Sequence, residues 1–277
     1  MIAWDLPQNM ISATVEIQQR QMDGRSTVGT GFLVNDPTPD GRPRTVLVTA
    51  NHVFERMPMT AAQVGYRVQA SDGGWRYAPE MIMIRDLDKA LWRRDPAHDI
   101  AVIEVKAPAE FARAAIPLNW LAGDDTFAKY GVGPGDEMMV LGYPQGLAAN
   151  TAGFPILRSG RVASPIEAAN ANPNFLLDFR VFPGNSGGPV FLADAAFHAP
   201  GEPGPGPAHV VAGMLTEQVE QDNQRLEIGV VTNAQFIRDA IALLDKPESA
   251  LRVPSHHAAP DPNASEASAS VGETTPD

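Results

Sequence analysis

The protein has 277 residues, of which 21 are basic and 33 acidic, so its formal net charge is −12. This excess of acid argues against a nucleic-acid-binding protein, because such proteins present a basic face to the phosphate backbone. The chain contains no cysteine, which excludes disulfide scaffolds, thiolate zinc sites and thiol nucleophiles.

Short apolar runs dominate the chain, and most are rich in Val, Ile, Leu and Thr and bounded by Gly, Pro, Asn or Asp, as strands between turns are. Many strands with little helical periodicity favour a β-sandwich or β-barrel over alternating βαβ units. In chain order, strands are expected at Ala13–Ile17, Val28–Val34, Thr45–Thr49, Tyr66–Ala70, Ile100–Val105, Glu137–Leu141, Leu157–Val162, Phe175–Phe179, Pro189–Leu192, Val210–Leu215 and Gly229–Thr232.

A clear helical pattern appears only late in the chain, where apolar residues recur at three- and four-residue steps from Phe236 to Leu244. Asn233 stands where its side chain can cap the first turn of this helix. A second, shorter helix is expected at Glu110–Ala115.

Two segments lack the composition of a packed core. Asp194–His209 contains four prolines and three glycines, which indicates a surface loop between two strands. Lys246–Asp277 has no aromatic residue and is rich in Ala, Ser and Pro, so it cannot bury enough apolar area to offset chain entropy. We therefore expect folded parts at 1–125 and 126–245 and a disordered tail at 246–277.

No apolar stretch approaches the length that spans a bilayer, and the first twenty residues lack the basic start and apolar core of a signal peptide. We therefore expect no membrane partner and a cytoplasmic location.

The most informative string is Pro183-Gly-Asn-Ser-Gly-Gly-Pro-Val190. A serine hydroxyl is a poor nucleophile unless a base removes its proton and hydrogen-bond donors stabilise the oxyanion that follows. Glycines around Ser186 let the backbone turn sharply, so the N–H groups of Gly184 and Ser186 can converge on one point. Taken alone, the string is somewhat more typical of a tight turn between two strands, so the functional interpretation needs partner residues.

Two partners precede it. His52 follows the strand at Thr45–Thr49, and Asp99 begins the strand at Ile100–Val105. Singly, each is more often structural: a satisfied core histidine, or an aspartate that caps a turn. Their order, His52 then Asp99 then Ser186, matches one of the chain orders known for Ser-His-Asp triads.

The motifs Thr49-Ala-Asn-His-Val53, Asp99-Ile-Ala-Val102 and Gly184-Asn-Ser-Gly-Gly-Pro189 resemble the triad motifs of trypsin-like (chymotrypsin-fold) serine proteases. The asparagine before the serine is most similar to the bacterial HtrA/Deg-like branch. With weaker similarities in the flanking strands, the resemblance covers about residues 10–245. It implies an all-β fold of two six-stranded antiparallel β-barrels with a C-terminal helix.

The resemblance also implies a serine endopeptidase that acts on polypeptides. His52 and Asp99 would lie on the first barrel and Ser186 on the second. His52 would take the proton of Ser186 and Asp99 would orient the imidazole, while the N–H groups of Gly184 and Ser186 would form the oxyanion hole. No cofactor is implied, and the six histidines show no metal-ligand spacing.

The chain also departs from the family. Many secreted members have aspartate where this chain has Asn185, so activation by a newly cut N-terminus is not expected. HtrA proteins usually continue into a PDZ domain, but here the low-complexity tail follows, so we expect a monomer.

The candidates for substrate binding are three residues: Arg180, Thr216 and Glu217. Arg180 lies where family members place a residue at the base of the primary specificity pocket, and a cation there would favour an acidic side chain before the scissile bond. The alternative is that Arg180 points outward or pairs with Glu217. Thr216 either brings a hydroxyl near Asp99 or is an ordinary strand threonine. The segment Met214–Gln218 would pair with an extended substrate.

A second hypothesis belongs to a different class. An unregulated protease in the cytoplasm would be harmful, so the chain could be a binding or regulatory module with the protease fold. It would stay latent until a regulatory partner protein orders the turn at Gly184–Ser186.

Overall fold

The computed structural model describes residues 5–192, 209–221 and 224–247. Almost all of the expected loop at Asp194–His209 and of the expected tail at 246–277 lies outside these residues. The chain divides into two compact units, Met1–Asp245 and Lys246–Asp277, and only the first is described below.

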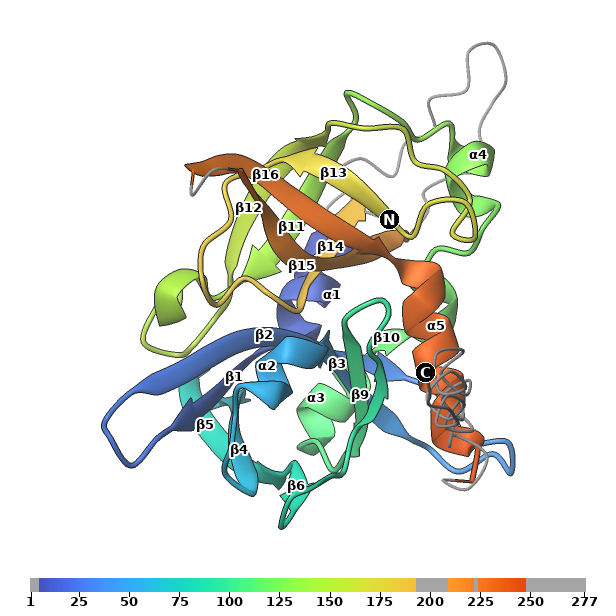
Figure 1. Ribbon diagram of the computed structural model, residues 1–277. Helices are drawn as coiled ribbons and strands as arrows, with labels where there is room; N and C mark the ends of the chain where they lie inside the picture. Colours follow the sequence, from blue (N-terminus) through green and yellow to red (C-terminus); the bar gives the residue numbers. More distant parts are fainter. Residues whose placement is uncertain (1–4, 193–208, 222–223, 248–277) are drawn as a thin grey trace, which may run out of the picture. The chain divides into compact units, whose positions relative to one another are not determined.

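The N-terminal half forms a largely antiparallel sheet with the strand order β5-β4-β1-β2-β3-β9-β8, and β10 pairs with β2 in parallel (Figure 1). A separate small hairpin joins β6 to β7. The strands are β1 (Thr14–Arg20), β2 (Ser26–Asn35), β3 (Thr45–Ala50), β4 (Ala61–Gln69), β5 (Trp75–Met83), β6 (Arg85–Asp86), β7 (Lys89–Ala90), β8 (Arg93–Asp95), β9 (Ile100–Val105) and β10 (Ile116–Pro117).

The C-terminal half closes into a six-stranded barrel with the order β11-β12-β13-β16-β15-β14. Its strands are β11 (Glu137–Gly142), β12 (Ile156–Val162), β13 (Asn174–Asp178), β14 (Gly188–Leu192), β15 (Val211–Gln221) and β16 (Gln224–Asn233). The helices of the unit are α1 (Asp5–Ala13), α2 (Asn51–Glu55), α3 (Ala109–Ala114), α4 (Thr126–Tyr130) and α5 (Ala234–Ala242), with 3-10 turns η1 (Leu118–Trp120), η2 (Pro144–Gly146) and η3 (Leu243–Asp245).

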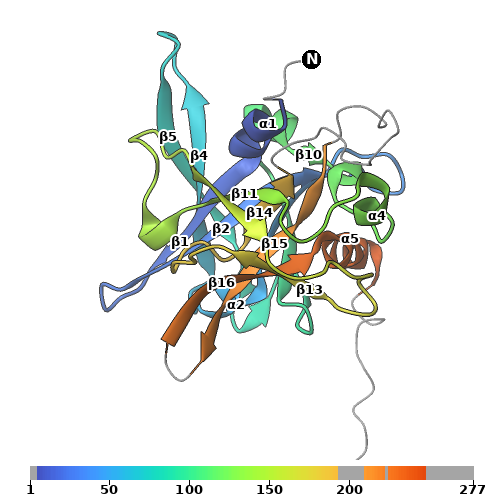
Figure 2. The ribbon, with the colours of Figure 1, turned by 90° about the horizontal axis from the view of Figure 1, so that it is seen from above.

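The expected fold class is confirmed, with one difference in the N-terminal half. That sheet has eight strands and is only partly barrel-like, because its end strands β5 and β8 do not pair with each other. The hairpin of β4 and β5 projects at the edge of the sheet (Figure 2), and Met81 and Met83 on β5 are exposed.

Each expected strand and both expected helices have a counterpart. The late helix begins where the cap was expected, since the side chain of Asn233 accepts a hydrogen bond from the N–H of Gln235 at 3.0 Å. The sequence did not indicate α1, whose residues Leu6, Met10 and Ala13 are buried.

The two halves pack directly on one another. Strands β14 and β15 contact β2 and β3, and α5 contacts β8 and β9 as well as β15. Strand β3 therefore has cover on both faces, and its residues Val46, Leu47 and Val48 are fully buried. This explains why β3 has a continuous apolar run rather than an alternating pattern.

A buried arginine on β4 joins the halves. The guanidinium of Arg67 donates hydrogen bonds to the hydroxyl of Tyr143 at 3.1 Å and to the carbonyl oxygen of Gly153 at 3.0 Å, both in the C-terminal half. It also donates to the carbonyl oxygen of Thr14, after α1, at 2.9 Å. Its flat guanidinium lies against the rings of Phe111 and Phe154.

A second buried arginine fastens the end of the folded unit. Arg44, at 4% exposure, forms ion pairs with Asp36 in the N-terminal half and with Asp245 in η3. The last turn of the unit is therefore tied to the N-terminal sheet by charge as well as by packing.

Candidate active site

His52 and Asp99 are brought together by the pairing of β3 with β9. Ala50, the last residue of β3, lies opposite Ile100, the first residue of β9. Asp99 precedes β9, and His52 is the second residue of α2, which follows β3 directly. Two neighbouring strand ends therefore carry the two side chains.

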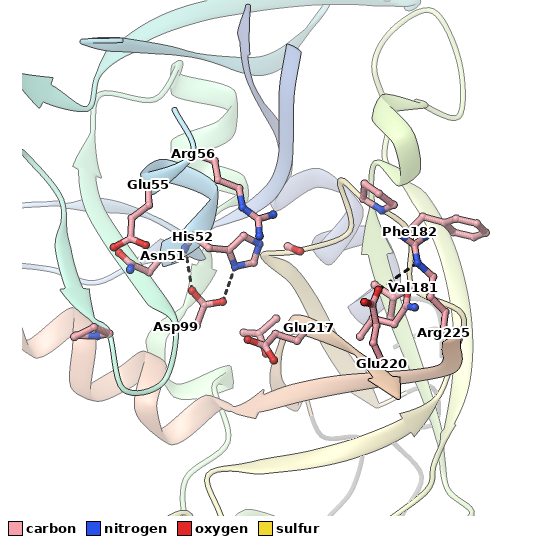
Figure 3. Close-up of a pocket in the computed structure, with 15 residues that line it drawn as sticks. Asn51, His52, Glu55, Arg56, Asp99, Val181, Phe182, Glu217, Glu220 and Arg225 are labelled. Atoms are coloured by element: carbon pink, nitrogen blue, oxygen red, sulfur yellow. Dashed lines mark hydrogen bonds and ion pairs between the residues drawn. The ribbon is translucent and has the colours of Figure 1, made fainter. Parts of the chain in front are cut away.

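The contact between them is a pair of hydrogen bonds (Figure 3). Asp99 Oδ2 lies 2.7 Å from His52 Nδ1, and Asp99 Oδ1 accepts the backbone N–H of His52 at 2.9 Å. The backbone of Asp99 has a left-handed φ of 54°, which is uncommon for a residue other than glycine. The N–H of Asn51 donates to the Asp99 carbonyl oxygen at 2.9 Å, which helps to hold this conformation.

Ser186 lies in a tight turn before β14 that requires glycine on either side of it. Gly184 and Gly187 have φ values of 93° and 88°. A Cβ atom on Gly184 would collide with the carbonyl oxygen of Tyr143, and one on Gly187 with that of Thr30. The Gly-rich string is thus dictated by backbone conformation and by close backbone contacts.

Two backbone N–H groups of this turn are not used in its own hydrogen bonds to the described residues. The carbonyl oxygens from Pro183 to Ser186 accept, in order, from Gln145 N, Thr30 Oγ1, Gly188 N and Thr30 N. The N–H groups of Asn185, Gly187 and Gly188 also donate within the protein. Within the described residues, the N–H groups of Gly184 and Ser186 donate no hydrogen bond. These are the two groups expected to bind the oxyanion.

His52, Asp99 and Ser186 all line one cavity of about 610 Å³. In the described part of the chain, the hydroxyl of Ser186 makes no hydrogen bond, either to His52 or to another residue. Residues of both halves form the walls: Asn51, Glu55, Arg56 and Pro96 from the N-terminal half, and Val181, Phe182, Pro183, Thr216, Glu217, Gln218, Glu220 and Arg225 from the C-terminal half.

The three candidate specificity residues lie in different places. Arg180 does not line the cavity; its guanidinium is exposed, pairs with Glu227 at 3.2 Å and lies 5.2 Å from the centre of the Phe182 ring. The wall residue is its neighbour Val181.

Thr216 and Glu217 do line the cavity. The hydroxyl of Thr216, however, lies 3.2 Å from that of Thr232 and 3.3 Å from the Val230 carbonyl oxygen, and it makes no bond to Asp99. In Figure 3, Glu217 lies between the His52–Asp99 pair and an ion pair of Glu220 with Arg225, whose atoms are 3.3 Å apart. This ion pair could not be predicted from the sequence, because its members come from two paired strands.

The described residues contain no group of three or more His, Asp or Glu side chains arranged to hold a metal ion. No helix among them has both the length and the apolar character needed to cross a membrane.

Comparison with known families decides the identity of the chain. The family model described as "trypsin-like peptidase domain" matches residues 29–197, a span that includes His52, Asp99 and Ser186. The chain belongs to this family. The family takes its description from peptidases, which are enzymes that cleave peptide bonds.

Solved structures with the same fold include HtrA-type proteases. The HtrA-type protease AlgW, solved with a tripeptide, has a TM-score of 0.55 and 16% sequence identity, over 89% of this peptidase and 64% of that chain. A serine endoprotease from Yersinia pestis has a TM-score of 0.54 and 17% identity, over 88% of this peptidase and 67% of that chain. This peptidase thus spans less than two thirds of the AlgW chain. The comparison with curated proteins returns no match.

Proposed function

We propose that this trypsin-like peptidase is a serine endopeptidase that uses Ser186, His52 and Asp99 as its catalytic triad and passes through an acyl-enzyme. The observation that carries the proposal is the convergence of these residues on one cavity, beside the N–H groups of Gly184 and Ser186, which donate no hydrogen bond to any described residue. In this arrangement residues 1–125 supply His52 and Asp99, and residues 126–245 supply Ser186.

The proposed reaction follows from these positions. Ser186 Oγ attacks the scissile carbonyl carbon while His52 Nε2 takes the hydroxyl proton. Asp99 accepts a hydrogen bond from Nδ1–H across the 2.7 Å contact, which fixes the imidazole tautomer and stabilises its positive form. His52 then returns the proton to the leaving amine, and the acyl-enzyme is hydrolysed by water activated by the same imidazole.

The oxyanion of the tetrahedral intermediate would lie between the N–H groups of Gly184 and Ser186. A donor of this kind contributes about 10²–10³ in kcat, because it is oriented before charge develops. Since the donors belong to the backbone, the conformation of the turn decides whether they are available.

We further propose that an extended polypeptide pairs with β15 at Met214–Gln218, with Thr216 and Glu217 beside its side chains. Arg180 would then act through the ring of Phe182, which lines the cavity, rather than by binding substrate charge. A basic or neutral polypeptide suits the exposed carboxylate of Glu217 better than an acidic one.

A serine-directed fluorophosphonate probe tests the assignment. The wild-type protein should be labelled and should cleave a peptide library, and Ser186→Ala should abolish both. The matched control is Ser159→Ala, which changes an exposed serine on β12 and should keep both activities. A folded wild-type protein with neither activity would contradict the proposal.

A regulatory partner is the second candidate. It would require the turn at Gly184–Ser186 to be disordered until the partner binds, whereas the hydrogen bonds to its four carbonyl oxygens favour an ordered turn in the protein alone. Activity of the isolated protein that rises many-fold on adding a cell extract would favour gating. Full activity of the isolated protein would reject it.

A further inference from the structure

A single threonine of the N-terminal half holds the turn that carries Ser186. Thr30 lies on β2 and is fully buried. Its hydroxyl donates to the carbonyl oxygen of Gly184 at 2.6 Å, and its backbone N–H donates to that of Ser186 at 2.9 Å. These contacts join residues about half the chain apart and cross between the two halves of the unit.

We propose that Thr30 is a positioning residue that keeps the oxyanion hole in its binding conformation. The inference rests on the proposed function and extends it to a residue that does not touch substrate. Through the contact of Thr30 with the turn, packing of the two halves holds the turn in the conformation that can bind the oxyanion.

The conformation of the turn follows from peptide geometry. In a trans peptide unit the carbonyl group of one residue and the N–H of the next point in opposite directions, so fixing one fixes the other. The unit that bears the Ser186 N–H lies between the units that bear the Gly184 and Ser186 carbonyls. Thr30 holds both of those neighbours. The unit itself is held by the Gly188 N–H, which donates to the Asn185 carbonyl oxygen at 2.9 Å, and Thr30 keeps the units on either side of it in place.

The hydroxyl of Thr30 also makes a second hydrogen bond, which explains why a hydroxyl-bearing residue is needed at this position. It accepts the N–H of Tyr143 at 3.1 Å while it donates to Gly184. Tyr143 follows the last residue of β11, and its carbonyl oxygen is the atom against which Gly184 packs. One atom must therefore donate and accept within a buried site, which a hydroxyl can do and a methyl group cannot.

Gln145 completes the support from the C-terminal half. Its N–H donates to the Pro183 carbonyl oxygen at 2.6 Å, and its own φ is 55°, in the left-handed region. This contact orients the unit that bears the Gly184 N–H. Thr30, through Tyr143, thus constrains the segment that leads into Gln145 as well as the turn itself.

The test compares Thr30→Ser with Thr30→Ala. Both variants lose the methyl group, and only Thr30→Ala loses the hydroxyl, so their difference isolates the hydrogen bonds. With a peptide substrate, Thr30→Ala should lower kcat by about 10- to 100-fold with little change in KM, because support of an oriented group is lost rather than a substrate contact. Thr30→Ser should retain most of the wild-type kcat. A peptide boronate, whose tetrahedral adduct presents an oxygen to the same donors, should bind Thr30→Ala more weakly by a similar factor.

Thr14→Ala is the matched control, since Thr14 is also a fully buried threonine whose hydroxyl bonds a backbone carbonyl, that of Met10 at 2.7 Å. It should keep the wild-type kcat. If Thr30→Ala does not fold, Thr30→Val, which preserves the side-chain volume, takes its place in the same assay.

The outcomes separate the two proposals. Equal losses in Thr30→Ser and Thr30→Ala would show that the methyl group matters and would overturn the positioning role. So would a wild-type kcat in Thr30→Ala or Thr30→Val, or a loss of equal size in Thr14→Ala. A wild-type protein without Ser186-dependent activity would instead reject the proposed function itself, and the role of Thr30 with it.

Discussion

Arg67 Nη1 donates a hydrogen bond to the hydroxyl of Tyr143 across 3.1 Å, from a strand of the N-terminal sheet to the first residue after β11 in the barrel. The same tyrosine donates its backbone N–H to Thr30. A buried cation and the turn that carries Ser186 are therefore connected through Tyr143 and Thr30, so the packing of the two halves and the catalytic geometry depend on each other.

Replacing Arg67 should destabilise the protein. Burial lowers the pKa of its guanidinium, because the charged group loses contact with water. The hydrogen bonds of the guanidinium offset part of this cost. Arg67→Met would leave several buried carbonyl oxygens without donors and should reduce the free energy of unfolding by about 3 kcal/mol. Urea denaturation measures this change.

The control for Arg67 is Arg76→Met on β5, where an exposed guanidinium lies 4.0 Å from Asp72 and little change is expected. An Arg67→Met protein as stable as the wild type would show that the cost of burying the charge cancels its bonds.

Asp99→Asn should impair catalysis far more than it impairs binding. The amide cannot hold the imidazole in the required tautomer, and in proteases with this triad the change lowers kcat by about 10⁴-fold. Steady-state kinetics on a peptide substrate should show this fall with KM nearly constant.

Asp95→Asn provides the comparison, because Asp95 contacts His98 Nδ1 at 2.6 Å and neither residue lines the cavity. Its kcat should stay close to that of the wild type. If both variants lost activity alike, the effect would reflect the loop between β8 and β9 and not a role of Asp99 as the triad acid.

Glu16 should make stability depend on pH. Burial raises the pKa of its carboxyl group above 4.5, and the hydrogen bond from Tyr77 opposes that rise. The folded state then binds the proton more tightly than the unfolded state, so the free energy of unfolding should fall as pH increases from about 4.5 through the raised pKa. Above that window the loss is complete.

Urea denaturation from pH 4 to 8 checks this, with Glu16→Gln as the reference that lacks the titrating group. Between acid and neutral pH, the free energy of unfolding should fall in the wild type because of Glu16. Glu16→Gln should lack this part of the fall, so the two profiles should diverge most at neutral pH. Tyr77→Phe, which removes the opposing hydrogen bond, should raise the Glu16 pKa further and extend the window upward. A wild-type profile parallel to that of Glu16→Gln would contradict the expectation.

The features that could be predicted from the sequence are those that depend on residues close together in the chain. The triad order and the Gly-rich turn were visible because each motif needs particular residues within a few positions. Strand β9 was predicted with its observed bounds because its apolar run begins directly after Asp99 and ends before Lys106, shortly ahead of Pro108. The helix cap at Asn233 was visible for the same reason.

What the sequence did not indicate depends on contacts between distant segments. Helix α1 is short, and its buried face is defined by α3, β2 and β10, which it contacts. Strand β5 carries exposed residues such as Met81, so it lacks the alternation of a half-buried strand. The importance of Thr30 is likewise hidden, because its partners lie more than 100 residues away.

Arg180 illustrates a limit of inference from spacing alone. Its distance from Ser186 suggested the base of the specificity pocket, with an outward orientation as the favoured alternative, and in the structure it is exposed and pairs with Glu227. We therefore predict that Arg180→Gln leaves the preferred side chain before the scissile bond unchanged. A peptide-library digest of both proteins checks this, and the ratio of kcat/KM for acidic and neutral residues at that position should be equal within experimental error.

The matched variant is Val181→Thr, which changes the neighbouring residue that does line the cavity. It adds a hydroxyl at nearly constant volume to the wall of the cavity, so it should shift the preference away from apolar residues by about 10-fold or less. A preference for acidic residues in the wild type that disappears in Arg180→Gln would show instead that the guanidinium leaves Glu227 and turns into the cavity when substrate binds.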